Sequence, residues 1–428
     1  MTEVVAVTIF VIAFVLIATE WVHRVVVALA GAGLMLLFRL VSATDAFSSE
    51  RFGVDWNVVF LLFGMMVIVG VLRHTGVFEY LAIWSAKKAR GRPFRVLVVL
   101  VVITGVAAAL LDNVTTVLLV APVTVLIAER LGANPVPFLI AEAMASNIGG
   151  TATLIGDPPN IIIASEAHLT FLDFISNLAP LVLLLMGVFL VLARILFRGS
   201  FEFRPDRVDE IMALDEGEAL TGGPLLPRAL AVLVLVTLGF LFHGLLGYEP
   251  SAVALLGAGV LLLISRREPE LFLREVEWRT LAFFIGLFIM VGALVKVGVI
   301  EDLARRAIDV VDGRLFFAVV LLVLVSGVLS AVVDNIPYVA TMAPLVRQLA
   351  AAMPGETTVL WWALALGADL GGNATTIGAS ANVVVLGVAE RSGARISFME
   401  FLKYGSVVTV VTLGISLLYL WLRYFVLG

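Results

Sequence analysis

The sequence predicts an all-α polytopic membrane protein with an inverted-topology repeat, about ten transmembrane helices and two re-entrant hairpins. Of its 428 residues, 61% are hydrophobic and 14% are charged, whereas soluble globular chains have about 45–50% apolar and about 25% charged residues. Two polar motifs lie inside apolar segments and recur at a constant spacing, which indicates two structural repeats. Basic loops occur at alternate connections, which indicates one orientation for the whole chain.

The repeat is visible in two motifs, each separated from its second copy by 222 positions. Asp112-Asn113 lies in LLDNVTTVLLVAP, and Asp334-Asn335 lies in VVDNIPYVATMAP. The segment 147–160, NIGGTATLIGDPPN, returns at 369–382 as DLGGNATTIGASAN. Paired polar motifs of this kind are typical of transporters whose binding site lies between two repeats.

The elements follow from the apolar segments, because a spanning helix needs about 20 apolar residues. The first repeat, 1–197, contains spans near 3–20, 22–41, 56–78 and 177–197, a hairpin over 94–131 and an interrupted helix over 135–165. The second repeat, 228–428, contains spans near 228–248, 250–264, 278–297 and 402–427, a hairpin over 314–352 and an interrupted helix over 358–388. The Asp-Asn motif breaks each hairpin into halves at the lower length limit for a span, which favours re-entrant hairpins. The polar segment 198–227 joins the repeats as a linker.

The orientation follows from parity and from the basic loops. Each repeat crosses the membrane an odd number of times, so the two repeats must insert in opposite directions. With the N-terminus outside, the basic loops at 87–95, 194–207 and 266–279 all lie in the cytoplasm, as the positive-inside rule requires. The linker is then cytoplasmic as well. The loop 300–314, with Arg305, Arg306 and Arg314, is the exception.

Carboxylates inside the apolar segments are the first candidates for a functional site. Asp112 and Asp334 lie in the middle of apolar runs, where a charge costs at least about 2.5–3.5 kcal/mol and usually lines a polar cavity or ion path. The alternative is that each aspartate caps a helix. Thr115 and Thr116 follow the first tip and can supply hydroxyls, and their equivalents are Pro337 and Tyr338.

The glycine-rich motifs are the second candidates. A double glycine should unwind the helix and free carbonyl groups for a cation and N–H groups for a substrate oxygen. The alternative is close helix packing. The site residues predicted from these motifs are Asn147, Gly149, Gly150, Thr151, Asp157, Asn160, Asp369, Gly371, Gly372, Asn373 and Asn382.

The charges of these motifs restrict the ligand. Asp112, Asp157, Asp334 and Asp369 should converge, and the motifs contain no Arg or Lys. Such a site favours Na⁺, H⁺ or a neutral hydroxylated solute. Glu142 also lies in an apolar stretch, either as a second proton carrier or as a cap near a helix start. The chain has no cysteine and no visible nucleophile–base pair or metal cluster, so we expect neither an enzyme nor a cofactor.

These residues resemble the ion transporter superfamily, which includes the arsenite permease ArsB, the melanocyte P protein, the NhaD sodium/proton antiporters and the sodium–dicarboxylate carriers. The resemblance covers nearly the whole chain, and NIGGTATLIGDPPN looks like the family signature. It implies a scaffold domain that dimerises and a transport domain that moves as an elevator. It also implies sodium sites at Asn113, Asn147, Gly150, Asn335 and Asn373.

The sequences of the hairpin tips indicate which branch of the superfamily the chain resembles and which function to expect. Dicarboxylate carriers have Ser-Asn-Thr there, whereas this chain has an aspartate before each asparagine, so it looks more like the ArsB and P-protein branch. We therefore expect proton- or sodium-coupled efflux of a small inorganic oxyacid, namely arsenite or antimonite. The alternatives are a Na⁺/H⁺ antiporter, a sodium-coupled dicarboxylate or other anion symporter, and a passive anion channel.

The expected surroundings follow from the same reasoning. The protein should be a multi-pass protein of the cell (inner) membrane and a homodimer in the lipid bilayer. Its expected partners are a small inorganic solute and a coupling cation, with a cytoplasmic ATPase subunit as a further candidate. No nucleic acid is expected.

Overall fold

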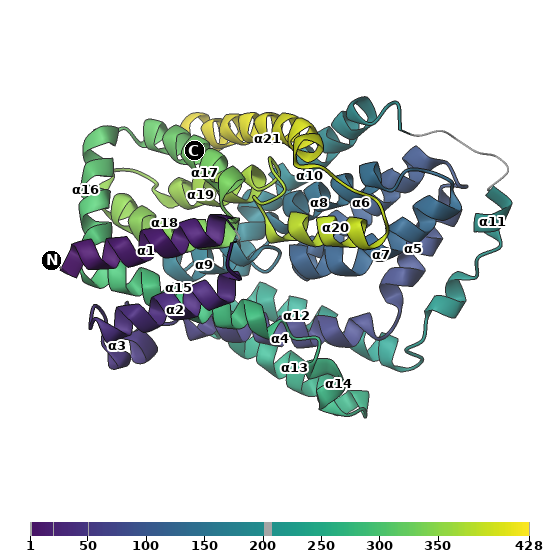
Figure 1. Ribbon diagram of the computed structural model, residues 1–428, viewed down its shortest axis with the longest axis horizontal. Coiled ribbons are helices and arrows are strands. Elements are labelled where there is room, and N and C mark those ends of the chain that lie inside the picture. Colours follow the sequence, from purple (N-terminus) through teal and green to yellow (C-terminus); the bar gives the residue numbers. More distant parts are fainter. Residues whose placement is uncertain (1, 20, 50, 201–207, 428) are drawn as a thin grey trace.

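The computed structural model describes residues 2–19, 21–49, 51–200 and 208–427, and within them every regular element is helical (Figure 1). Positions 1, 20, 50, 201–207 and 428 lie outside the described residues. They include Arg204 and Arg207 of a predicted basic loop, part of the predicted linker and the ends of predicted segments. Nine of the described helices are long and apolar enough to cross a membrane, so the prediction of a polytopic membrane protein is confirmed.

The helices begin and end within a few residues of the predicted segments. In the first half they are α1 (Thr2–Thr19), α2 (Arg24–Leu37), α3 (Ala43–Ser48), α4 (Trp56–Arg73), α5 (Val77–Lys88), α6 (Pro93–Leu110), α7 (Asn113–Arg130), α8 (Val136–Gly150), α9 (Pro158–Ala167) and α10 (Phe171–Leu196). The linker contains α11 (Val208–Met212) and the 3₁₀-helix η2 (Glu216–Ala219).

The second half repeats this order. It contains α12 (Leu225–Leu246), α13 (Pro250–Ser265), α14 (Pro269–Leu273), α15 (Trp278–Lys296), α16 (Val299–Val311), α17 (Leu315–Val332), α18 (Asn335–Ala352), α19 (Thr358–Gly371), α20 (Ser380–Arg391), α21 (Phe398–Trp421) and a terminal π-helical turn, η3 (Leu422–Val426).

Of the described helices with ten or more residues, α5 and α16 were not predicted from the sequence, and they begin 222 positions apart. The expectation of a loop at 300–314 is wrong because α16 buries Ile300, Ala304 and Val311 on one face and exposes charged residues on the other. Figure 1 shows α16 at one end of the long axis and α5 with α11 at the other. An inverted repeat requires this opposite placement of equivalent helices.

Asp112 and Asp334 each lie between the two helices of a pair, where the first helix has ended and the second begins. Asp112 accepts a hydrogen bond from the Thr115 backbone N–H at 2.7 Å, and Asp334 accepts one from the Ile336 N–H at 3.0 Å. Both aspartates are therefore N-caps of α7 and α18. Because α6, α7 and α17 are each long and apolar enough to span, re-entrance of the hairpins stays a prediction.

The glycines of the repeated motifs allow two helices in each half to touch. A Cβ on Gly149 would lie 2.1 Å from the Gly105 carbonyl oxygen of α6, and one on Gly371 would lie 2.6 Å from the Gly327 carbonyl oxygen of α17. Only glycine permits these approaches. The glycines therefore do serve close helix packing. The expected helix breaks are present as well, since α8 ends at Gly150 and α19 at Gly371.

The described part of the linker lies against α5. Lys87 donates a hydrogen bond to the Leu214 carbonyl oxygen at 3.0 Å and pairs with Glu216. The hydrogen bond from the Lys87 ammonium holds the pKa of the half-buried Glu216 carboxyl below its usual range. The linker is thus docked on the predicted cytoplasmic end of the first half.

We predict that Gly149→Ala destabilises the protein by about 1–3 kcal/mol through overpacking against α6. The control is Gly414→Ala in α21, where a Cβ would meet nothing within 4 Å, and where alanine should be neutral or stabilising by up to about 1 kcal/mol. Thermal midpoints of the detergent-purified variants measure both effects. Equal midpoints would contradict the backbone contact.

Candidate functional site

A buried cluster of amides and carboxyls joins the two halves at Asp157, which is fully buried. One Asp157 carboxylate oxygen accepts a hydrogen bond from Asn113 Nδ2 at 2.8 Å, and Asn335 Nδ2 lies 3.3 Å from both oxygens. Asn113 and Asn335 are the first residues of α7 and α18. The two Asp-Asn motifs therefore meet on one carboxylate.

Asn147 makes the second connection between the halves. Its Oδ1 accepts a hydrogen bond from Asn113 Nδ2 at 3.2 Å, and its Nδ2 donates to Asn373 Oδ1 at 3.0 Å and to Asn382 Oδ1 at 3.2 Å. All four asparagines are buried. Residues from both glycine-rich motifs thus share one network, which we call the Asp157 cluster.

The carbonyl groups freed at the helix breaks accept hydrogen bonds in the same way in both halves. Asn160 Nδ2 donates to the Gly150 carbonyl oxygen at 3.3 Å, and Asn382 Nδ2 donates to the Gly372 carbonyl oxygen at 2.7 Å. The predicted cation ligand at Gly150 therefore already has one protein partner. A carbonyl oxygen has a second lone pair for another.

Several buried oxygen atoms of the cluster have no hydrogen-bond partner among the described residues. They are Asn113 Oδ1, Asn160 Oδ1 and both carboxylate oxygens of Asp369, which lies beside Thr151 and Asn160. Unsatisfied buried acceptors are costly. A hard cation, or a proton on a carboxylate, would satisfy them.

The charge of the cluster points to the same ligands. Asp369, Asp334 and Asp112 lie within electrostatic range of Asp157. Four carboxyls in a poorly solvated interior need protons or cations to neutralise them. The arrangement can therefore hold a small cation or exchange protons.

Arg24 is a candidate site residue that the sequence reasoning missed. Its Nη1 donates to Ser380 Oγ at 2.7 Å and lies 3.3 Å from Asp334 Oδ2. Its guanidinium also lies over the Phe283 ring, 5.4 Å from the centroid. The motifs themselves contain no basic residue, but the fold brings the cation of Arg24 in α2 next to them. The signal was a lone charge near the start of an apolar span, which is by default a functional candidate.

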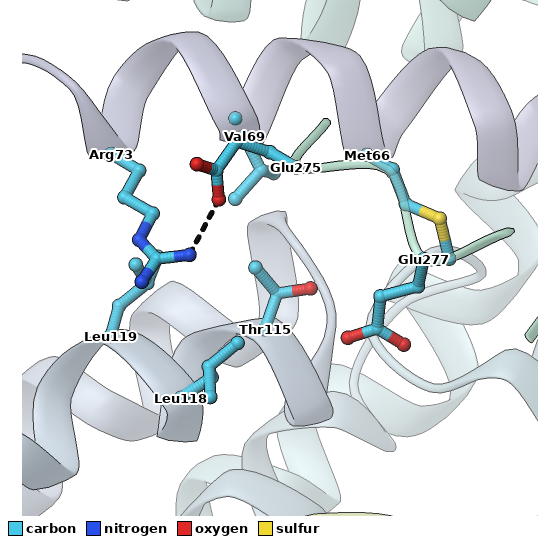
Figure 2. Close-up of a pocket in the computed structure, with 9 residues that line it drawn as sticks. Met66, Val69, Arg73, Thr115, Leu118, Leu119, Glu275 and Glu277 are labelled. Carbon is cyan, nitrogen blue, oxygen red and sulfur yellow. Dashed lines mark hydrogen bonds and ion pairs between the residues drawn. The ribbon is translucent and has the colours of Figure 1, made fainter. Parts of the chain in front are cut away.

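The two threonines after the first tip lie in different surroundings. Thr116 is fully buried, and its hydroxyl has no partner among the described residues. Thr115 lines a separate pocket of about 20 Å³ at the predicted cytoplasmic side. Figure 2 shows the Arg73–Glu275 ion pair, whose nitrogen–oxygen distance is 2.5 Å, beside Thr115 and Glu277. The pocket has room for about one water molecule.

A much larger cavity, of about 1070 Å³, opens on the predicted outer side. Polar groups line it, including Asp55, Ser165, Glu166, His168, His243 and Arg347, and Arg347 pairs with Glu166 at 2.8 Å. Its apolar lining includes Leu154, Ile161 and Ala340. Asn113 and Asn335, which donate hydrogen bonds to Asp157, are not among the described residues that line this cavity.

Helices of spanning length and a buried polar cluster between the two halves of the chain are features of multi-pass membrane transporters. The chain belongs to the CitMHS family, described as citrate transporter, whose family model matches residues 14–367. The family and the relatives below are transporters, which confirms a transporter rather than an enzyme. Its bacterial relatives place it in the inner membrane.

The comparisons also support the superfamily resemblance. The chain is 56% identical to "Uncharacterized transporter Rv2684" of Mycobacterium tuberculosis (strain H37Rv), over 99% of each chain. It is 32% identical to the P protein of Homo sapiens, over 97% of this chain and 59% of that protein. The crystal structure of the Alcanivorax borkumensis YdaH transporter matches with a TM-score of 0.64 at 15% identity, over 99% of this chain and 98% of that one. The last likeness shows a shared fold alone.

We predict a coupling energy of about 1–2 kcal/mol between Arg24 and Asp334, because Asp334 is mostly buried. A double-mutant cycle with Arg24→Gln and Asp334→Asn, read by unfolding of the purified protein, measures it. The exposed Arg305–Glu301 pair of α16 is the control, with an expected coupling of about 0.3–0.5 kcal/mol. A coupling energy no larger than that of the control pair would contradict the Arg24–Asp334 contact.

Proposed function

We propose that this protein is a secondary active transporter that couples the movement of a small oxygen-rich solute to H⁺ or Na⁺, with the Asp157 cluster as the coupling-cation site. One observation carries the proposal: the polar motifs of both halves meet on the Asp157 carboxylate, within a buried network that still has unsatisfied oxygen atoms. The candidate ligands are the carboxyls of Asp157 and Asp369 and the neighbouring asparagine amides.

The coupling follows from the cost of charge in a membrane. Buried carboxylates without a counter-charge are costly in a poorly solvated interior, whereas the same cluster with a bound cation or proton is less so. Conformational exchange is therefore favoured when the cluster is occupied. This linkage makes transport depend on the cation gradient.

The packing supports an elevator motion with the hairpins in the moving part. Helices of both halves interlock around the cluster, because α20 packs against α7 and α8, and α9 packs against α18 and α19. A second group contains α1, α2, α4, α12, α13 and α15, in which α15 packs on α2 and α13 on α4. We propose that the first group moves against the second, and that the second forms a homodimer. A cytoplasmic ATPase subunit stays a candidate partner.

The solute we favour is arsenite or antimonite, exported from the cell. Arsenite is a small neutral hydroxylated molecule at neutral pH, so the acidic cluster does not repel it. Its hydroxyls can exchange hydrogen bonds with amides and carboxyls, and the chain has no thiol to capture it.

A carboxylate anion such as citrate is the second candidate. The family description names citrate, and Arg24 supplies one cation at the edge of the cluster. In that case the coupling cation would offset the repulsion between the anion and the aspartates.

Reconstituted liposomes separate these candidates. Arsenite, citrate and Na⁺ are tested one at a time against an imposed pH gradient. Movement of Na⁺ with protons and without either solute would identify a Na⁺/H⁺ antiporter. Flux that never exceeds the solute's own gradient would identify a passive channel and contradict the proposal.

We predict that Asp157→Asn and Asp369→Asn each reduce coupled transport at least about tenfold, as loss of ligand support does at ion sites, while the protein still folds. The control is Asp302→Asn on the exposed face of α16, where the side chain is 56% exposed. Rates like those of the wild type in either cluster variant would refute the assignment.

A further inference from the structure

We propose that Glu142 is a second proton-binding site, distinct from the Asp157 cluster and connected to it along the interface between α7 and α8. The role of Glu142 in coupling rests on the proposed cation-driven transport. The binding of a proton by Glu142 does not depend on that proposal.

Glu142 is buried in the interior of α8, with 1% of its surface exposed. One carboxylate oxygen accepts a hydrogen bond from the hydroxyl of Thr124 in α7, which is itself fully buried. The other oxygen, Oε2, has no partner among the described residues. Because α8 begins at Val136, the alternative that Glu142 caps a helix start is wrong.

Among the residues that the structure describes, no cation pairs with the Glu142 carboxylate. The helices packed against α8 are α6, α7, α10, α19 and α20. The described parts of these helices make no ion pair with Glu142. Their charged groups are Arg95, Glu129, Arg130, Asp173, Arg194, Glu390 and Arg391 towards the helix ends, and Asp369 in the cluster. An unpaired buried carboxylate costs several kcal/mol, so the free Oε2 is the place for a proton.

The equivalent pair in the second half shows that packing does not require this polar contact. The positions 222 residues after Thr124 and Glu142 are Val346 and Leu364, and both are fully buried. An apolar pair of similar size thus fills the same place in the repeat. Only the first half therefore has a hydroxyl and a carboxyl at these positions. Together these two groups can hold a proton.

The interface between α7 and α8 connects this pair to the Asp157 cluster. Ser146 lies one turn beyond Glu142 on α8, and its hydroxyl donates to the Asn113 carbonyl oxygen at 2.8 Å. Asn147 follows and accepts from the Asn113 amide. A change of charge at Glu142 alters the packing of α7 on α8, and Asn113 is the next polar contact along that interface.

Infrared spectroscopy of the purified protein tests for the proton without any solute. We expect a carbonyl stretching band of a protonated carboxylic acid that disappears reversibly when the pH is raised. The band should be absent in Glu142→Gln and shifted in Thr124→Val, which loses the hydrogen bond. An unchanged set of acid bands in Glu142→Gln would overturn the proposal.

A second measurement tests the coupling. In liposomes with an imposed gradient of about one pH unit, each coupled proton that is lost lowers the limiting accumulation of the solute about tenfold. We expect this loss, with arsenite and with citrate as probes, in Glu142→Gln and in the Thr124→Val/Glu142→Leu double variant. The double variant reproduces the second half's own residues and should keep the wild-type thermal midpoint. Unchanged accumulation would overturn the coupling role, and absence of transport by the wild type would refute the proposed function while leaving the infrared result decisive for the proton.

Discussion

The hydrogen bonds that Asp157 accepts from Asn113 and Asn335 are the interaction on which the rest of the structure depends. They bring the starts of α7 and α18 to one buried carboxylate, so both helix pairs must break near that point. The caps at Asp112 and Asp334 make those breaks stable. The close contacts at Gly149 and Gly371 bring the interrupted helices near enough for Asn147 to reach Asn373.

A shortage of positive charge sets the chemistry of this centre. Asp112, Asp334 and Asp369 all lie within electrostatic range of Asp157. Among the described residues, the ion pair of Arg24 is with Asp334. A bound cation or proton completes the balance, and this requirement links the buried network to an ion gradient.

The sequence allows the helix breaks and the two motifs to be predicted because their causes are local. Capping by Asp112, the double glycines and the lengths of the apolar segments all depend on neighbouring residues. The helices α5 and α16 were missed because neither is an apolar segment of spanning length: they have 12 and 13 residues and contain charged side chains. The alternation of apolar and charged residues in α16 was the signal that could have predicted it. Arg24 and Thr124 could not be assigned from the sequence, since their partners lie on other helices and only tertiary packing brings them together. The same holds for the asparagine side chains of the Asp157 cluster, because tertiary packing determines their hydrogen-bond partners.

The most direct test of the central claim is cation binding by the purified protein, without transport. Calorimetric titration with Na⁺, together with the number of protons taken up on acidification, should be compared between the wild type and the Asp157→Asn/Asp369→Asn double variant. The account predicts that the wild type binds Na⁺ or takes up protons and that the double variant loses this binding while it stays folded. Equal binding of both ions by the two proteins would contradict it.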